Sequence, residues 1–144
     1  MKVMKIATVP APSVELECTI KDAIPLLIRQ HGCAVAVMKG NRIVGTLSRE
    51  DVVARAIGSG LNPERTKVSE IMNSPAATVS METETDEALK WMFANRKCHL
   101  GIVDQDGILK GWLAICSLFE DHVEDLTREL DSLSAYISAD GPGG

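Results

Sequence analysis

Residues 14–48 read VELECTIKDAIPLLIRQHGCAVAVMKGNRIVGTLS, and residues 79–114 read VSMETETDEALKWMFANRKCHLGIVDQDGILKGWLA. The two stretches align with a single added residue in the second, and the order of local signals is the same in both. The matched pairs are Ala23 with Ala88, Cys33 with Cys98, Ile43 with Ile108, Gly45 with Gly111 and Leu47 with Leu113. The sequence therefore predicts one structural unit that occurs twice.

Each copy opens with a predicted helix and continues with two predicted strands. Thr19 and Asp22 give the first helix a capping-box start, and Pro25 inside it predicts a kink or a late start. Short apolar runs separated by turn residues then predict the strands. These runs are 33–38 and 42–47 in the first copy and 100–103 and 108–113 in the second.

Ser48 marks the start of a second helix in the first copy, and Gly58 and Gly60 mark its end. Its predicted apolar stripe is Val52, Val53, Ala56 and Ile57, and the stripe of the helix in the second copy is Ala88, Leu89, Met92 and Phe93. One unit alone would leave a sheet face uncovered. Two units packed face to face cover each other, so we expect the pair to fold as one body.

Composition narrows the class of protein. Aromatic residues make up only 3% of the chain, so the core must consist of aliphatic side chains. A net charge of −5 argues against a broad nucleic-acid interface. No apolar run approaches the roughly 20 residues of a membrane helix, and the N-terminus lacks the features of a signal peptide. We expect a cytoplasmic protein whose four cysteines, which lack CxxC spacing, are buried and reduced.

Two motifs carry a family resemblance. GTLSREDVV (45–53), which closes the first copy, and KVSEIMNSPAATV (67–79), which opens the second, resemble the marks of a tandem CBS-domain pair, or Bateman module. The resemblance implies an α/β (α+β) fold of two βαββα repeats packed around a pseudo-twofold axis, with a C-terminal helical extension. It divides the chain into repeat 1 (1–62), repeat 2 (63–122) and an acidic helical tail (123–144) with a disordered end.

The resemblance also implies a ligand and its site. Members of this family commonly bind AMP, ADP, ATP or S-adenosylmethionine between the repeats, regulate an attached or partner protein, and pair as dimers. Their G-x-x-S/T-x-x-D pattern falls on Gly45, Ser48 and Asp51. Asp51 would accept hydrogen bonds from ribose, Gly45 would admit the ligand, and free N–H groups behind Ser48 would favour a phosphate. A capping box of Ser48 and Asp51 is the alternative, although a cap leaves one carboxylate oxygen free.

Further ligand contacts come from the second repeat. The resemblance places the opening strand of the second repeat against the ligand. Small side chains in this segment would admit a purine. The segment is Asn73, Ser74, Pro75, Ala76 and Ala77. Candidate phosphate contacts are Arg49, Lys97 and His99, for which surface solvation is the alternative.

The second repeat departs from the family pattern. Ala114 and Ser117 stand where the family has Ser/Thr and Asp, so no carboxylate is available for ribose. Ser117 and Glu120 form a capping box that predicts a shifted helix start. A second cleft, which would use Thr8, Pro10 and residues 32–34, is therefore in doubt, and we expect one nucleotide per chain. Trp112 is expected in the core, with stacking on a base as the alternative.

The last helix carries a heptad pattern. Its apolar positions alternate four and three residues apart: Phe119, Val123, Leu126, Leu130, Leu133 and Ile137. Acidic residues cover its other faces. Such a stripe either folds back on its own module, pairs with another protomer or docks a protein partner, and the sequence leaves these alternatives open.

Taken together, these features favour a regulatory adenine-nucleotide-binding module that passes its ligand state to a partner or a dimer. One alternative is a ligand-free structural or dimerisation pair acting through the C-terminal helix, and another is an S-adenosylmethionine binder. An enzyme is disfavoured, because the sequence has no HExxH, GxSxG or P-loop motif and its histidines belong to different elements.

Overall fold

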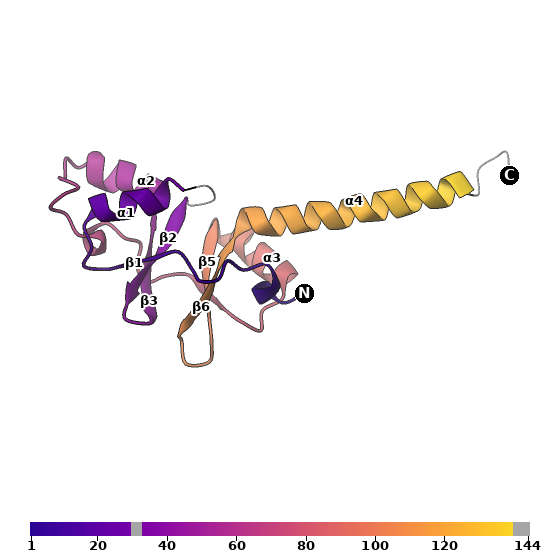
Figure 1. The fold of residues 1–144 in the computed structure, drawn as a ribbon, viewed down its shortest axis with the longest axis horizontal. Coiled ribbons are helices and arrows are strands. Elements are labelled where there is room, and N and C mark those ends of the chain that lie inside the picture. Colours follow the sequence, from indigo (N-terminus) through magenta and orange to yellow (C-terminus); the bar gives the residue numbers. More distant parts are fainter. Residues whose placement is uncertain (30–32, 140–144) are drawn as a thin grey trace.

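The computed structural model describes residues 1–29 and 33–139. Gly32, expected at a second cleft, lies outside this range. The closing segment 139–144 is expected to be disordered; its residues 140–144 also lie outside the range, whereas Ala139 is helical. Two three-stranded sheets form, with strand orders β1-β2-β3 and β4-β5-β6 (Figure 1). The strands are β1 (Ser13–Glu15), β2 (Ala34–Lys39), β3 (Arg42–Ser48), β4 (Thr78–Ser80), β5 (His99–Val103) and β6 (Leu109–Ala114).

Helices flank each sheet. They are α1 (Ile20–Leu27), α2 (Arg49–Asp51) with its π-helical continuation η2 (Val52–Ile57), α3 (Thr85–Asn95) and α4 (Ile115–Ala139). The predicted cap of α1 is confirmed, because the backbone N–H of Asp22 donates to Thr19 Oγ1 over 3.3 Å. Pro25 lies inside α1, as predicted. Short 3₁₀ turns occur at Val3–Lys5 (η1) and Val68–Glu70 (η3).

The two halves have the same topology. In each sheet the first pair of strands is parallel and the second pair is antiparallel. Both antiparallel pairs shift register at matching places, between Val37 and Met38 and between Ile102 and Val103. The predicted repeat and the predicted mixed α/β fold are therefore confirmed.

Each half has its own aliphatic core, built at matching positions. Ala23 and Leu47 are fully buried in the first core, and their counterparts Ala88 and Leu113 are fully buried in the second. The segment that precedes each sheet packs in the core of the other half. Val3 packs in the second core, and Val68 and Ile71 pack in the first. This exchange ties the halves together, because each core needs residues from a segment that precedes the other sheet.

A third buried cluster lies between the sheets and contains Ala34, Ala36, Met38 and Trp112. Trp112 is 3% exposed, which confirms its expected place in the core. The sheets approach closely here. A Cβ atom added to Gly101 would lie 3.0 Å from Cδ1 of Ile43 and 3.1 Å from Cδ1 of Leu109.

Several expectations about burial are wrong. Val53, Ile57 and Phe93 were expected in apolar helical stripes but are exposed, because only the sides of η2 and α3 that carry Val52, Ala56, Ala88 and Met92 face the sheets. Cys33, Cys98 and Cys116 are exposed, and Cys18 is half-buried. Cys33 and Cys98 immediately precede β2 and β5, and Cys116 lies in the first turn of α4, so their apolar neighbours in sequence do not cover them.

Helix α4 leaves the body of the molecule and projects from it as a single rod (Figure 1). It begins at Ile115, so the later start expected from Ser117 and Glu120 is wrong. The apolar stripe of α4 is exposed from Phe119 to Ile137, which rules out folding back on the module. Within residues 1–29 and 33–139, no helix combines the length and the apolar character that crossing a bilayer requires.

Candidate ligand-binding cleft

A cleft of about 570 Å³ opens where the two halves meet. This volume lies within the range of small-molecule sites. The first half contributes Cys33, Ala34, Thr46, Ser48, Arg49, Glu50 and Asp51, the linker contributes Asn73, and the second half contributes Arg96, Lys97, Cys98 and His99. A ligand in this cleft would therefore contact both halves of the molecule.

Asp51 is the most buried charged residue that lines the cleft, with 7% of its surface exposed. Its Oδ2 accepts hydrogen bonds from the backbone N–H of Ser48 at 2.8 Å and from the Ser48 hydroxyl at 3.0 Å. The Asp51 backbone N–H lies 3.2 Å from Ser48 Oγ. Ser48 and Asp51 thus form a reciprocal capping box at the start of α2, as the pattern of residues predicted.

The cap does not leave the second carboxylate oxygen free. Asn73 Nδ2 lies 3.0 Å from Asp51 Oδ1 and 2.9 Å from Oδ2, and Arg55 Nε lies 3.9 Å from Oδ1. The expectation of a free oxygen is therefore wrong, because a linker residue distant in sequence completes the environment of the carboxylate. Two of the N–H groups behind Ser48 are also engaged, since that of Arg49 donates to the Cys33 carbonyl and that of Asp51 to Ser48 Oγ.

Arg55 fixes the linker that carries Asn73. Its Nη1 donates to the carbonyls of Ile71 and Met72 at 3.2 and 3.1 Å, and its Nη2 donates to Asn73 Oδ1 at 2.8 Å. Sequence reasoning missed this residue. The available signal was its position four residues after Asp51, a spacing that places two helical side chains side by side.

Three cations line the cleft, two from the second half and one from the first. Arg96 and Lys97 follow α3 and are exposed, and Arg96 adopts a left-handed backbone conformation (φ 53°) that ends the helix. Arg49 comes from the opposite half, where its Nε donates to the Leu27 carbonyl at the end of α1. Arg49 and Lys97 therefore line the same cleft, as expected, together with Arg96, which the sequence analysis did not single out.

His99 sits deeper and links the halves. Its ring stacks on Trp112 with centroids 5.6 Å apart, and its Nε2 lies 3.1 Å from Cys33 Sγ. Burial lowers the pKa of His99 below its ordinary value, which favours the neutral ring at pH 7. Partial burial raises the pKa of the Cys33 thiol, so this group also stays uncharged. A neutral ring can donate an N–H to a phosphate but brings no positive charge, so the phosphate contact of His99, which lines the cleft, stays a prediction.

Four expected residues do not line the cleft: Gly45, Ser74, Ala76 and Ala77. Gly45 is instead pressed against the linker, because an added Cβ would lie 2.7 Å from the Asn73 carbonyl oxygen and 2.7 Å from Met72 Sδ. The Ser74 hydroxyl donates to the Val44 carbonyl at 2.9 Å. Ala77 packs against the second core.

The matching position in the second half differs chemically. Ala34 pairs with Ser48 across β2 and β3, and His99 pairs with Ala114 across β5 and β6. Ala114 thus takes the place of Ser48, and Ser117 the place of Asp51. The chain offers one buried carboxylate at these two matching positions, in the first half.

Comparison with known proteins identifies the family to which this architecture belongs. The family model for the CBS domain matches residues 3–58. A CBS domain-containing protein of Arabidopsis thaliana is 35% identical over 74 residues, which are 51% of this chain and 13% of that protein, so this chain spans a small part of that relative.

Solved structures agree over more of the chain. A protein from Burkholderia ambifaria described as a signal-transduction protein with CBS domains has a TM-score of 0.78 at 25% identity, covering 87% of this chain and 96% of the other. A CBS domain protein from Pyrobaculum aerophilum, complexed with AMP, has a TM-score of 0.73 at 22% identity, covering 81% and 89%. This chain belongs to the CBS-domain family and is built as a CBS-domain pair.

Proposed function

We propose that this chain is a regulatory module that binds an adenine nucleotide, AMP, ADP or ATP, in the cleft between its repeats. The observation that carries the proposal is the buried carboxylate of Asp51, which lines a cleft of ligand size opposite Arg96 and Lys97. A carboxylate acceptor and cations across one cleft match the ribose and the phosphates of a nucleotide.

Ribose recognition falls to Asp51. Its partner Asn73 offers one amide group to both carboxylate oxygens, and two adjacent ribose hydroxyls can offer the same oxygens two donors. Binding would then exchange one set of hydrogen bonds for another without leaving the carboxylate unpaired, which avoids the large cost of an orphaned buried charge. Ser48 would keep its place as the cap.

Phosphate recognition falls to the cations from both halves: Arg49, Arg96 and Lys97. The backbone N–H groups at the start of α2 contribute less to this role than the sequence suggested, because Ser48 and Cys33 engage two of them. The cations favour the nucleotide over S-adenosylmethionine, because S-adenosylmethionine has no phosphate and carries a net positive charge. Four other expected site residues would contribute to ligand binding indirectly, by setting the backbone position of β3 and of the linker: Gly45, Ser74, Ala76 and Ala77.

A ligand can regulate only through a difference in its affinity for two states of the module. The cleft is lined by α2, by the linker and by the segment between α3 and β5, so a bound nucleotide would alter the relative position of the halves. The AMP complex of the Pyrobaculum relative supports an adenine nucleotide as the ligand class. We propose residues 1–62 and 63–122 as the repeats and 123–144 as the extension that reports the change to a dimer or a protein partner.

Titration calorimetry with AMP, ADP, ATP and S-adenosylmethionine tests the proposal. We expect saturable binding of one nucleotide per chain. Asp51→Asn should weaken it about tenfold or more, as expected for a charge-assisted hydrogen bond. Glu50→Gln is the matched control, because Glu50 lines the same cleft but takes no part in the capping box. The affinity of the Glu50→Gln variant for nucleotide should stay within about twofold of wild type, as for an exposed charge.

A second function is favoured by one observation: two residues of this chain, Ser48 and Asn73, donate hydrogen bonds to the Asp51 carboxylate. In a purely structural CBS pair this network would serve only to hold the linker against α2. Absence of heat and of thermal stabilisation with all four compounds would support that function and exclude the sensor. Binding of S-adenosylmethionine in preference to the nucleotides would reassign the ligand.

A further inference from the structure

We propose that α4 forms a parallel, two-stranded coiled coil with α4 of a second copy of this chain. This inference does not depend on nucleotide binding. It rests on the exposure of one apolar stripe, on the residue types along it and on the charges beside it.

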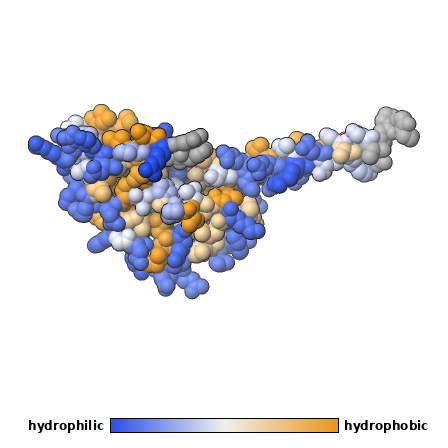
Figure 2. All heavy atoms as spheres, in the orientation of Figure 1, coloured by the Kyte–Doolittle hydropathy of each residue, from blue (hydrophilic) through white to orange (hydrophobic). Residues whose placement is uncertain are grey.

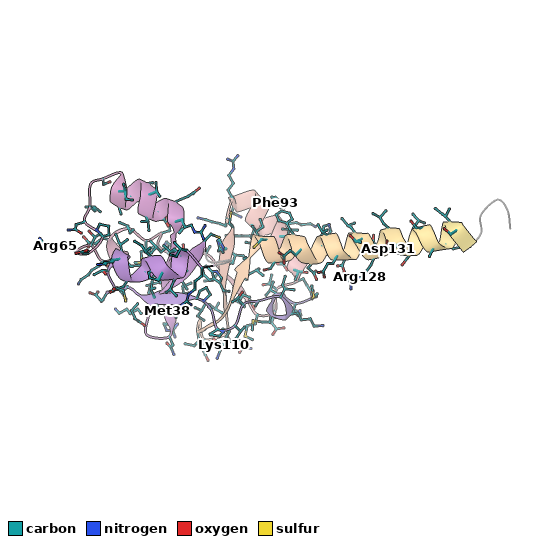
Figure 3. The ribbon with its side chains drawn as sticks, turned by 45° about the horizontal axis from the view of Figure 1, so that its top comes forward. Met38, Arg65, Phe93, Lys110, Arg128 and Asp131 are labelled. Atoms are coloured by element: carbon teal, nitrogen blue, oxygen red, sulfur yellow. The ribbon has the colours of Figure 1, made fainter. Side chains whose placement is uncertain are left out.

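The stripe, here called the seam, consists of Phe119, Val123, Leu126, Leu130, Leu133 and Ile137. These six side chains are 40–64% exposed. They alternate four and three residues apart, which aligns them on one side of a helix that supercoils with a partner. Figure 2 shows apolar side chains on α4 outside the body of the molecule, and Figure 3 shows side chains projecting from the outer half of the helix.

The module occupies a different side of α4. Leu118 is 3% exposed and belongs to the second core, and Asp121, His122 and Asp125 face a hollow shared with Met1 and α3. Within the described residues, this side holds the helix to the body, and the seam points elsewhere. From Val123 outward, a partner can therefore cover the seam without displacing the contacts that Leu118 and the hollow make with the described part of the body.

In the part of the chain that the structure describes, the seam contacts the body at its base. The rings of Phe119 and Phe93 meet edge to face with centroids 5.5 Å apart. Phe93 lies on the exposed side of α3 near the start of α4 (Figure 3). This contact continues the apolar surface of the seam onto α3.

The residue types along the seam indicate how many helices form the coiled coil. In the heptad register set by the spacing, Val123, Leu130 and Ile137 occupy a positions, and Phe119, Leu126 and Leu133 occupy d positions. β-Branched residues at a with leucine at d favour two parallel strands. Two of the three a positions are β-branched, and two of the three d positions are leucine.

Charge decides between parallel and antiparallel pairing. Most acidic residues of α4 lie at outer positions, and Glu120 and Glu129 flank the seam. In a parallel pair, Glu129 faces Ser134 of the second copy and Glu120 faces Ile115, so no like charges meet. The antiparallel arrangement that pairs all six seam residues sets Phe119 against Ile137 and places Glu129 beside Glu129 of the second copy.

The seam is fewer than three heptads long, and so short a coiled coil is marginal by itself. We therefore expect a reversible dimer whose population rises with protein concentration. Sedimentation velocity over a wide concentration range measures this equilibrium directly. A monomer at every concentration would overturn the proposal.

Leu130→Asp and Ser132→Asp form a matched pair for this measurement. Both add one carboxylate to the same turn of α4, the first on the seam and the second on the opposite side. Leu130 is 64% exposed, so its replacement leaves the module intact. Leu130→Asp should weaken dimerisation about tenfold or more, because a charge at an a position would be buried, and Ser132→Asp should not. Dimers unaffected by Leu130→Asp would show that another surface pairs.

Disulfide trapping reads the orientation. Val123→Cys and Leu133→Cys are each treated with oxidised glutathione, which is reduced as the interchain disulfide forms, and are compared with wild type, which reports any background from the native cysteines. Parallel pairing predicts that each variant forms covalent dimers alone, because a faces a and d faces d. Antiparallel pairing predicts covalent dimers only when the two variants are mixed, and that result would overturn the parallel assignment.

Discussion

Asn73 donates its side-chain amide to the Asp51 carboxylate from 22 residues away, with Nδ2 lying 3.0 Å from Oδ1 and 2.9 Å from Oδ2. The contact joins the start of α2 to the linker that leads into the second half. Arg55 holds the other end of the same amide at 2.8 Å. The residue proposed to bind ribose therefore has an internal partner, and a ligand must compete with it.

Asn73→Ala separates the structural role of this contact from its competition with ligand. The variant should lose about 1 kcal/mol of unfolding free energy, as for one partly buried hydrogen bond. Its affinity for nucleotide should rise, because the ribose hydroxyls would no longer have to displace the amide. Chemical denaturation and calorimetry measure the two effects.

Ser74→Ala is the control for Asn73→Ala. It removes a side-chain hydrogen bond from the same linker, to the Val44 carbonyl, without touching Asp51. It should lower the free energy of unfolding and leave the affinity for nucleotide unchanged. A loss of affinity in Asn73→Ala alone would mean that the amide contacts the ligand directly, which contradicts the competition.

Gly45→Ala tests how closely the linker approaches β3. The added methyl would lie 2.7 Å from both the Asn73 carbonyl oxygen and Met72 Sδ, and the carbonyl is held by the backbone hydrogen bond from Thr46. We expect a loss of about 1–3 kcal/mol of unfolding free energy from overpacking. Gly111→Ala at the matching position is the control. Its nearest contact would be 3.3 Å, to Ala7 Cβ, so equal losses in the two variants would contradict this account.

The stability of the protein should fall in mildly acidic solution because of His99. Burial lowers its pKa in the folded state, so the unfolded chain binds more protons below about pH 6.5, the ordinary value for histidine. The stability is therefore complete above that pH and is lost as the pH falls toward the folded-state pKa. Cys33 and the Trp112 ring, the groups that contact His99, supply no negative charge to oppose this loss.

Thermal denaturation of wild type and His99→Gln at about pH 7.5 and about pH 5.5 checks this effect. The Tm of wild type should decrease more than that of the variant. His122→Gln, on the exposed surface of α4, should behave as wild type does. An unchanged pH dependence in His99→Gln would show that other groups cause it.

The sequence predicted the repeat because its signals are local. Turn residues, strand runs and the helix caps at Thr19 and Ser48 act over a few residues, and the structure shows a one-way cap at Thr19 and the full capping box at Ser48. The exchange of Val3 and Ile71 between the cores was not predictable from such patterns, since it depends on how two packed sheets receive the segments that precede them. The same limit applies to the site. Ser48 and Asp51 follow from spacing, whereas the contact of Asp51 with Asn73 depends on the path of the linker.

The cations of the cleft should discriminate between ligands by their charge. Arg96→Gln with Lys97→Gln removes two exposed positive charges from the second half without altering the Asp51 network. We expect ATP affinity to fall roughly threefold to tenfold, as for two solvent-exposed charge pairs, and the effect to shrink at high salt. The affinity for AMP should fall less, and the affinity for adenosine should hardly change. Lys90→Gln, on the exposed surface of α3, is the matched control. An equal loss for adenosine and ATP would mean that the two cations shape the cleft and do not contact phosphate.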